Sequence, residues 1–349
     1  METFTIDHLA SELNKIRADL KLFVDRKRNY KSLKSAFKKK IGYELNLDNP
    51  KSYNEKIIWK KLNDRNPLLT LTADKYAVRD YIKDAVGEDT ATSILIPLYY
   101  VTKNPGDIPF EDLPDKFVIK PNHGSQMHLI VKNKKNIPSN QMVNECKKWL
   151  KTHHGLYNYE WAYRNIKRKI IVEKLLETNN GSLPLDYKLF CFHGECKYIR
   201  AQFNRFDKEV LTGYFNLDWE LLPVYRPGYN PINVILDKPQ NLDKMITIAE
   251  KISRQFDAVR VDLYNCDGKI YFGELTHYDF CGLARFEPES FDFTLGKHWV
   301  LEPDYWLNPQ REAYPEGIEK EVAAQLKWLN MLRNKRSSRR YSEPSDHIT

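Results

Sequence analysis

The chain has 349 residues, of which 42% are hydrophobic and 13% aromatic, and it carries a formal net charge of +8. This composition indicates a folded globular protein with a sizeable core and excludes an intrinsically disordered chain. No apolar run approaches the roughly 20 residues that a bilayer-spanning helix needs. The five cysteines follow no C-x-x-C spacing, so we expect free thiols and neither a disulfide framework nor a zinc site.

Basic residues are concentrated in two segments. Residues 21–40 contain nine Lys or Arg, and residues 333–340 contain five more. Such runs are often simply solvated, but they also suit anionic lipid headgroups, an acidic polymer or nucleic acid. No recognised nucleic-acid-binding motif is present, so we expect no nucleic-acid partner. Because residues 1–7 lack the pattern of a signal peptide, we expect a cytoplasmic protein, with peripheral association at the inner face of the membrane through the basic segments.

Apolar residues at alternating spacings of four and three predict an amphipathic helix near the N-terminus. They are Leu9, Leu13, Ile16, Leu20 and Phe23. The spacing favours a helix that packs on the core, with a short oligomer seam as the alternative. Further helices are expected over residues 52–63 and 72–82, the latter with Thr72 as its N-cap. Residues 94–101 predict an edge strand, because Pro97 interrupts them.

From residue 116 onward, short β-rich runs alternate with helical patterns. The expected elements are strands over 117–120, 129–132, 170–176 and 187–192, a turn over 178–182 and helices over 139–151 and 241–255. A final helix carries Ile318, Val322, Leu326 and Leu329 on one side, and residues 333–349 are expected to be disordered.

Residues 259–264 and 269–276 predict a β-hairpin, because Asp267-Gly268 between β-rich runs is a strong turn signal. A three-residue loop would pair Asn265 with Lys269, and Arg260, Asp262 and Glu274 would then project from one face. The two carboxylates would be diagonal neighbours, roughly 7–8 Å apart or less. A two-residue loop would place Glu274 on the opposite face. Two acids and an arginine on one face suit a magnesium ion that carries phosphates, whereas an exposed Arg–Glu pair is the structural alternative.

In chain order, six motifs of this sequence together resemble the ATP-grasp superfamily, and most closely its TupA-like branch, which is associated with teichuronopeptide and other surface-polysaccharide genes. The motifs lie at 74–79, 116–125, 171–176, 186–194, 260–262 and 274–276. The resemblance covers about residues 46–300. It implies an α+β ATP-grasp fold, in which two α+β lobes clamp ATP, here with an N-terminal helical extension.

The resemblance also implies the roles of individual residues. The residues expected to bind ATP are Lys120, His123, Gly124, Ser125, Glu173, Lys174, Leu176, Asp186 and Lys188. Those expected to hold Mg²⁺ are Asp262, Glu274 and Thr276, and Arg260 is expected to be catalytic. Carboxylates suit this metal, which prefers them together with phosphate oxygens. Arg260 would stabilise the oxyanion of a tetrahedral intermediate.

The implied reaction is that of an ATP-dependent carboxylate–amine ligase, which forms an amide through an acyl phosphate. We expect it to attach an amino compound to a uronic acid of a cell-surface polysaccharide, so that its partners are a small-molecule or glycan carboxylate and an amine. The alternatives are a phospho- or glycosyltransferase of the same pathway and a non-catalytic module that binds nucleotide or glycan.

Two departures from the family pattern concern the phosphate loop and the substrate side. Gln126 follows Ser125 where the family usually continues with glycine, and a left-handed conformation there would cost glutamine on the order of 1–2 kcal/mol. Residues 277–283 replace a Pro/Gly-rich loop, of which only Gly282 remains. The expected segments are a basic helical segment (1–66), a pre-ATP-grasp segment (67–115), lobe 1 (116–180), lobe 2 (181–300) and a C-terminal helix with a basic tail (301–349).

Overall fold

The computed structural model describes residues 6–203, 210–232 and 236–301. Six helices come first: α1 (Ile6–Lys27), α2 (Lys31–Ile41), α3 (Tyr53–Asn63), α4 (Pro67–Ala73), α5 (Val78–Val86) and α6 (Glu88–Ile94). Helix α3 begins at a capping box, in which the Ser52 side chain accepts from the Glu55 amide and Glu55 accepts from the Ser52 amide. The expected final helix and the basic tail lie outside the described residues.

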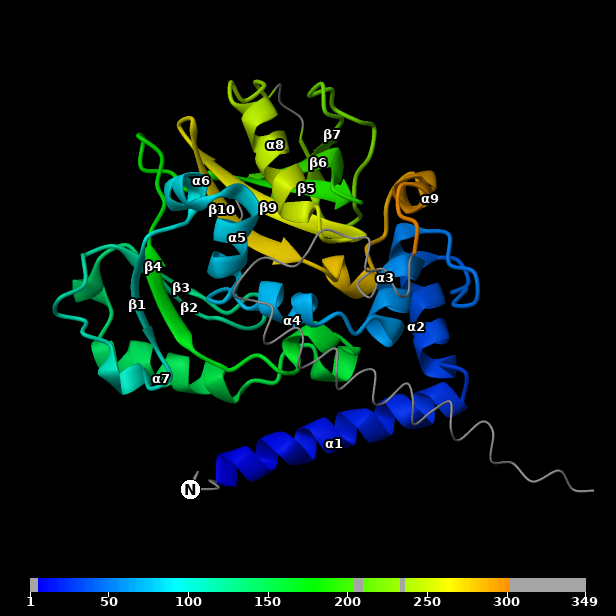
Figure 1. Cartoon of the computed structure of the whole chain (residues 1–349), viewed down its shortest axis with the longest axis horizontal. Coiled ribbons are helices and arrows are strands. Elements are labelled where there is room, and N and C mark those ends of the chain that lie inside the picture. Colours follow the sequence, from blue (N-terminus) through cyan, green and yellow to red (C-terminus); the bar gives the residue numbers. More distant parts are fainter. Residues whose placement is uncertain (1–5, 204–209, 233–235, 302–349) are drawn as a thin grey trace, which may run out of the picture.

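A four-stranded antiparallel sheet follows, in the order β1-β4-β2-β3. Its strands are β1 (Leu98–Thr102), β2 (Phe117–Pro121), β3 (Leu129–Val131) and β4 (Ile170–Lys174), and helix α7 (Ser139–Lys151) packs against it. The edge position of β1, directly after Pro97, confirms that prediction. Figure 1 shows this sheet on the left of the molecule, with α7 below it.

The second sheet has six strands in the order β10-β9-β5-β6-β7-β8. They are β5 (Leu185–Phe192), β6 (Glu195–Phe203), β7 (Leu211–Phe215), β8 (Asn230–Pro231), β9 (Ala258–Cys266) and β10 (Lys269–Thr276). Helix α8 (Leu242–Ser253) lies across this sheet (Figure 1), and α9 (Ser290–Lys297) follows it in the chain. The two sheets and their helices form the α+β architecture that we expected.

The six-stranded sheet has one apolar and one polar face, because side chains alternate along a strand. Leu189, Val261 and Leu263 are buried in the main core, which also includes α8 residues such as Met245 and Ile248. The intervening positions of β5, β6 and β9 carry Lys188, Arg200, Arg260 and Asp262. These charged side chains lie on the face that α8 does not cover.

Two expectations about the N-terminal helices are wrong. Thr72 is not an N-cap: it lies inside α4, where its hydroxyl donates to the Leu68 carbonyl, and the next helix, α5, starts only at Val78. Helix α1 does not pack its apolar stripe on the core, since Leu13, Ile16, Leu20 and Phe23 are 54–62% exposed. Helix α1 instead contacts the rest of the protein through polar side chains such as Asn14 and through Ala18 and Leu22, which lie off the stripe.

All five cysteines are free, as predicted. The expected segment boundaries stay a prediction, although one feature of the packing bears on them. Helices α3–α6 contribute to the same core as the six-stranded sheet, whereas α7 and the four-stranded sheet have a core of their own.

Candidate functional site

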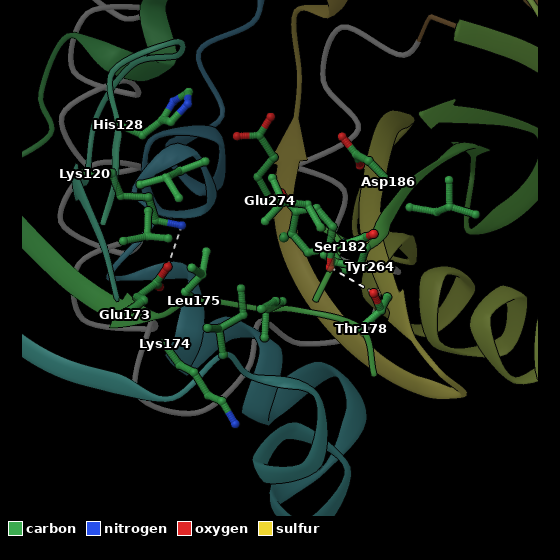
Figure 2. Close-up of a pocket in the computed structure, with 18 of the residues that line it drawn as sticks. Lys120, His128, Glu173, Lys174, Leu175, Thr178, Ser182, Asp186, Tyr264 and Glu274 are labelled. Atoms are coloured by element: carbon green, nitrogen blue, oxygen red, sulfur yellow. Dashed lines mark hydrogen bonds and ion pairs between the residues drawn. The ribbon is translucent and has the colours of Figure 1, made fainter. Parts of the chain in front are cut away.

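A cavity of about 660 Å³ opens between the two sheets, a size typical of small-molecule and cofactor sites. One side is formed by Lys120 and Glu173 of the four-stranded sheet, and the other by Asp186, Tyr264 and Glu274 of the six-stranded sheet. Figure 2 shows these two groups of side chains on opposite sides of the cavity. The segment that connects β4 to β5, residues 175–184, lines the cavity between the two sheets.

On the first side, the Lys120 ammonium lies 2.5 Å from Oε2 of Glu173. The two residues come from the paired strands β2 and β4. Arg79 Nη1 lies 3.9 Å from the same carboxylate and donates to the Ile96 carbonyl at 2.9 Å. The Glu173 side chain is almost completely buried, and Lys120 and Arg79 supply the counter-charge that its carboxylate needs there. The ion pair with Glu173 holds Lys120 at the cavity wall.

The loop after β2 approaches the cavity at Gly124, which has a φ of +80°. A Cβ there would lie 2.4 Å from Met127 Cε and 2.9 Å from His154, so only glycine fits. Gln126 also has a positive φ, of 61°, so this loop carries the conformational cost expected for glutamine in place of glycine. The backbone at position 126 is therefore left-handed even though glutamine stands there in place of glycine.

Lys75 joins this loop to the opposite side of the cavity. Its ammonium donates to the Gly124 carbonyl at 2.6 Å and lies 3.5 Å from Oε2 of Glu274. Burial lowers its pKa, against the opposing effect of Glu274. Asp74 positions Lys75, because its carboxylate accepts from the Tyr76 and Ala77 amides and from the Asn122 side chain. Lys75 was absent from the predicted site residues although the motif at 74–79 includes it.

The register of the predicted hairpin is different from the one we expected. Cys266 pairs with Lys269, so the turn has two residues, and Asp267 and Gly268 both have positive φ angles. A β-bulge between Phe272 and Glu274 then shifts the register by one residue. Glu274 consequently lies directly opposite Asp262, on the same face. The expected three-residue turn was wrong, but the bulge brings Glu274 to the same face as Asp262, as that turn had predicted.

A network of buried charges surrounds Asp262. Arg260 donates to both of its oxygens, from Nε and Nη2, each at 2.7 Å, and the Lys188 ammonium lies 2.8 Å from Oδ2. Lys188 also contacts Asp186, and Arg260 also contacts Asp279. Burial opposes ionisation of Asp262, but Arg260 and Lys188 outweigh it and hold the pKa of its carboxyl well below the usual value. The carboxylate therefore stays charged.

The predicted site residues divide into two groups. Those that line the cavity are Lys120, Gly124, Ser125, Glu173, Lys174, Leu176, Asp186 and Glu274. Those that do not are His123, Lys188, Arg260, Asp262 and Thr276. His123 is a buried residue of the loop after β2, while the other four belong to the charge network on the polar face of the six-stranded sheet. In Figure 2, the Lys174 side chain points away from Glu274, which leaves its backbone at the cavity.

The side chains expected to hold a metal have a suitable chemistry. Asp262 and Glu274 are cross-strand neighbours, and the Thr276 hydroxyl lies 3.4 Å from Oε1 of Glu274 and accepts from Arg260 at 2.9 Å. Within the described residues, no group of three or more His, Cys, Asp or Glu side chains could form a metal site by itself. Two carboxylates nevertheless fit Mg²⁺, which usually takes one or two of them together with phosphate oxygens.

No helix in the described part of the chain is long and apolar enough to cross a membrane.

Several solved structures are similar to the chain, at low sequence identity. They include D-alanine–D-alanine ligase from Bacillus anthracis complexed with ATP (14% identity, TM-score 0.34, 59% of this chain and 54% of that one). Two others are the ADP complex of PurK, an N5-carboxyaminoimidazole ribonucleotide synthetase (12%, 0.37, 60% and 46%), and an L-amino acid ligase from Bacillus licheniformis (13%, 0.39, 61% and 44%). The chain thus spans about half the length of these structures, and no curated protein matches it.

A family model identifies the chain much more clearly than these distant structures do. The model described as TupA-like ATPgrasp matches residues 55–300, which is well over half of the chain and includes both sheets and every predicted site residue. This match confirms the predicted ATP-grasp fold and its TupA-like branch. The chain belongs to the TupA-like ATP-grasp family.

Proposed function

We propose that the protein is an ATP- and Mg²⁺-dependent carboxylate–amine ligase that attaches an amino compound to a uronic acid of a cell-surface polysaccharide. The observation that carries the proposal is that the cavity lies directly beside the buried charge network around Asp262. The cavity offers Lys120 and Lys75 to phosphates, and the network presents Arg260 and Asp262 directly next to Glu274.

The cavity residues suit a nucleotide whose phosphates lie at Lys120 and Lys75 and whose adenine lies at residues 173–176. Lys120, Lys75 and the loop at Gly124 would bind the phosphates, since ammonium groups and turn amides both favour anions. The backbone of 173–176 would receive the adenine, and Asp186 the ribose hydroxyls. Bound Mg·ATP would supply the phosphoryl group that activates the carboxylate.

Arg260 is the residue that we assign to the reaction itself. Its guanidinium is fixed by Asp262 and Asp279, so it needs little reorganisation when charge develops on the substrate. Burial opposes its charge, but Asp262 and Asp279 outweigh this and raise its pKa, so Arg260 remains a cation throughout. A fixed cation beside the metal carboxylates would stabilise the oxyanion that forms when the amine attacks.

The test is ADP release from Mg·ATP in a panel of uronic acids and amino acids, with Arg260→Ala as the inactive control. The proposal expects ADP only when both a carboxylate and an amine are present. ADP release that needs a hydroxyl acceptor and no amine would favour a phosphotransferase instead. Binding of Mg·ATP without turnover on any pair would favour a non-catalytic module.

Helix α1 supports a second part of the proposal, namely association with an anionic membrane surface. The side that faces the protein is largely polar, with Ala18 and Leu22 as apolar exceptions. Asn14 accepts from Tyr157, Lys21 and Asp25 contact Tyr159, and Asp19 pairs with Arg164. Its apolar stripe therefore faces outward, the reverse of an ordinary surface helix. The basic residues lie mainly beyond the stripe: residues 21–40, which span the end of α1 and most of α2, contain nine Lys or Arg against one Asp, a charge that suits an anionic lipid surface.

This part is tested by flotation with vesicles of phosphatidylcholine alone or with an added anionic lipid. We expect binding to the anionic vesicles only, and its loss in the double variant Leu20→Ser/Phe23→Ser. Val300→Ser changes an equally exposed apolar side chain outside α1 and should bind normally. If the double variant instead converts a dimer into a monomer, while the wild type binds no vesicle, the stripe is an oligomer seam.

A further inference from the structure

Beyond Arg260, the polar face of the six-stranded sheet continues to a second pair of arginines. Arg200 of β6 lies in register between Lys188 of β5 and Tyr214 of β7. Arg226 comes from the segment between β7 and β8. The Cζ atoms of Arg226 and Arg200 lie 3.3 Å and 5.1 Å from the centroid of the Phe280 ring. Two guanidinium groups from separate segments therefore converge on one aromatic side chain.

Phe280 reaches this position through a strained loop. Phe280, Cys281 and Gly282 have successive positive φ angles of 46°, 60° and 72°. A Cβ at Gly282 would lie 2.9 Å from the Asn54 carbonyl oxygen of α3, so the loop fits against that helix only with glycine. The same loop places Asp279 beside Arg260. The segment that departs most from the family pattern thus forms part of the arginine pair's surroundings.

Among the described residues, two buried guanidinium groups meet here beside a single carboxylate, that of Asp279. Arg200 and Arg226 are only 3% and 8% exposed. Nε of Arg200 and both Nε and Nη1 of Arg226 are buried without a hydrogen-bond partner among the residues that the structure describes. Asp279 acts electrostatically on both, but its ion pair is with Arg260. Buried guanidinium groups with unused donors are costly, and an anion would satisfy them.

We propose that Arg200 and Arg226, with Phe280 beneath them, bind an oxyanion group of the acceptor substrate, either a carboxylate or a phosphate. Guanidinium forks bind such planar or tetrahedral groups by paired hydrogen bonds. This proposal rests on the ligase function above, since it places the acceptor on the side of Arg260 that faces away from the nucleotide cavity. The nucleotide phosphates have their own cations, Lys75 and Lys120, which line the cavity while the arginine pair does not.

The experiment measures binding of three sugars to the full chain by calorimetry, in the presence of Mg²⁺ and a non-hydrolysable ATP analogue. The probes are glucuronate, which has a carboxylate, glucose 1-phosphate, which has a phosphate, and glucose, which has neither. We expect one charged sugar to bind at least about tenfold more tightly than glucose, because hydrogen bonds to charged groups have about that effect. The sugar that binds identifies the oxyanion.

Arg226→Gln and Arg200→Gln should each abolish that preference while leaving the affinity for the ATP analogue unchanged within about twofold. Arg285→Gln is the matched control, because Arg285 is exposed and pairs with Glu287. Without ligand, Arg226→Gln should melt at the wild-type temperature or above, since it removes a buried charge without an ion-pair partner.

Three results would overturn the proposal. The first is equal binding of all three sugars, and the second is an unchanged sugar affinity in both glutamine variants. The third is a large loss of stability in these variants without a change in sugar affinity, which would show that the arginines have a structural role. Failure of the ligase proposal looks different, because the wild type would then not bind the ATP analogue. If Arg226→Gln does not fold, Arg226→Lys keeps the charge without the fork and should still weaken the preferred sugar.

Discussion

The two walls of the cavity differ in how they hold charge. On the four-stranded sheet, Lys120 and Glu173 form a compact pair at the cavity surface, and Lys120 is 17% exposed. On the six-stranded sheet, Asp262 and Arg260 are buried in a network that extends to Lys188 and Asp279. In the first wall, the partly exposed lysine can turn toward a bound anion while Glu173 keeps Arg79 as a neighbouring cation. The second is preorganised, and losing one member would leave charges without partners.

Asp262→Asn should have the largest effect on stability and turnover. A small effect would contradict the difference between the two walls. The substitution leaves Arg260 and Lys188 buried with half of their counter-charge, so we expect a loss of about 3–5 kcal/mol in the free energy of unfolding and no turnover. Glu274→Gln is the control: its side chain is 30% exposed, so turnover should be lost with little change in stability. Urea unfolding and ADP release measure both. Equal stability of the two variants would contradict the preorganised second wall.

Arg260→Lys tests whether the preorganised wall acts in the reaction. Lysine keeps the charge but cannot donate to Asp262 and Asp279 together, so we expect turnover to fall by about 10²–10³. The affinity for Mg·ATP should change far less, because the charge that Arg260 meets appears only during the reaction. ADP release and nucleotide binding are measured on the same samples, beside Arg285→Lys. Near-normal turnover would instead mean that the Arg260 network is structural.

The elements of both walls were predictable because their signals are local. The strand at 170–174 and the turn at Asp267-Gly268 follow from β-branched residues and from turn chemistry. The β-bulge before Glu274 has only a weak signal, since a glycine inside a strand, here Gly273, often marks a bulge but does not fix the register. The prediction of the shared face therefore succeeded by two errors that cancelled, a wrong turn length and a missing bulge.

Residues that depend on distant contacts were not predictable. The apolar periodicity of α1 correctly indicated a helix, but not which face meets the protein, because polar partners such as Tyr159 and Arg164 lie over a hundred residues away. Asp279 and Arg226 likewise acquire their neighbours only when loops and sheet come together. The family resemblance predicted roles for Lys120 and Glu173 of the first wall and for Arg260, whereas only burial and unused donors point to the arginine pair.

Asp292, a buried carboxylate outside the site, differs from Asp262 in the direction of its pKa shift. Asp292 of α9 accepts from Tyr43 and from the Asn54 amide, but it has no ion-pair partner in the described part of the chain, and burial raises its pKa to about 6. The folded protein then binds its proton more tightly than the unfolded chain does. Stability should therefore fall as pH rises from about 4 to 6, by on the order of 3 kcal/mol. Urea unfolding across this range should show the slope in the wild type and its loss in Asp292→Asn; an unchanged slope would contradict the assignment.

Lys120→Ala should have the smallest effect and tests the first wall. The variant removes one cation from the cavity and leaves Glu173 paired only with Arg79, so the folded state is affected little compared with the loss of Asp262. Mg·ATP binding should weaken by about tenfold, and the rise in melting temperature that it causes should shrink accordingly. Lys116→Ala is the matched control, because Lys116 lies one residue before the same strand and pairs at the surface with Glu177. Thermal shifts with increasing Mg·ATP separate the two variants. If Lys116→Ala and Lys120→Ala respond alike, Lys120 does not meet the phosphates, and the first wall loses its assigned role.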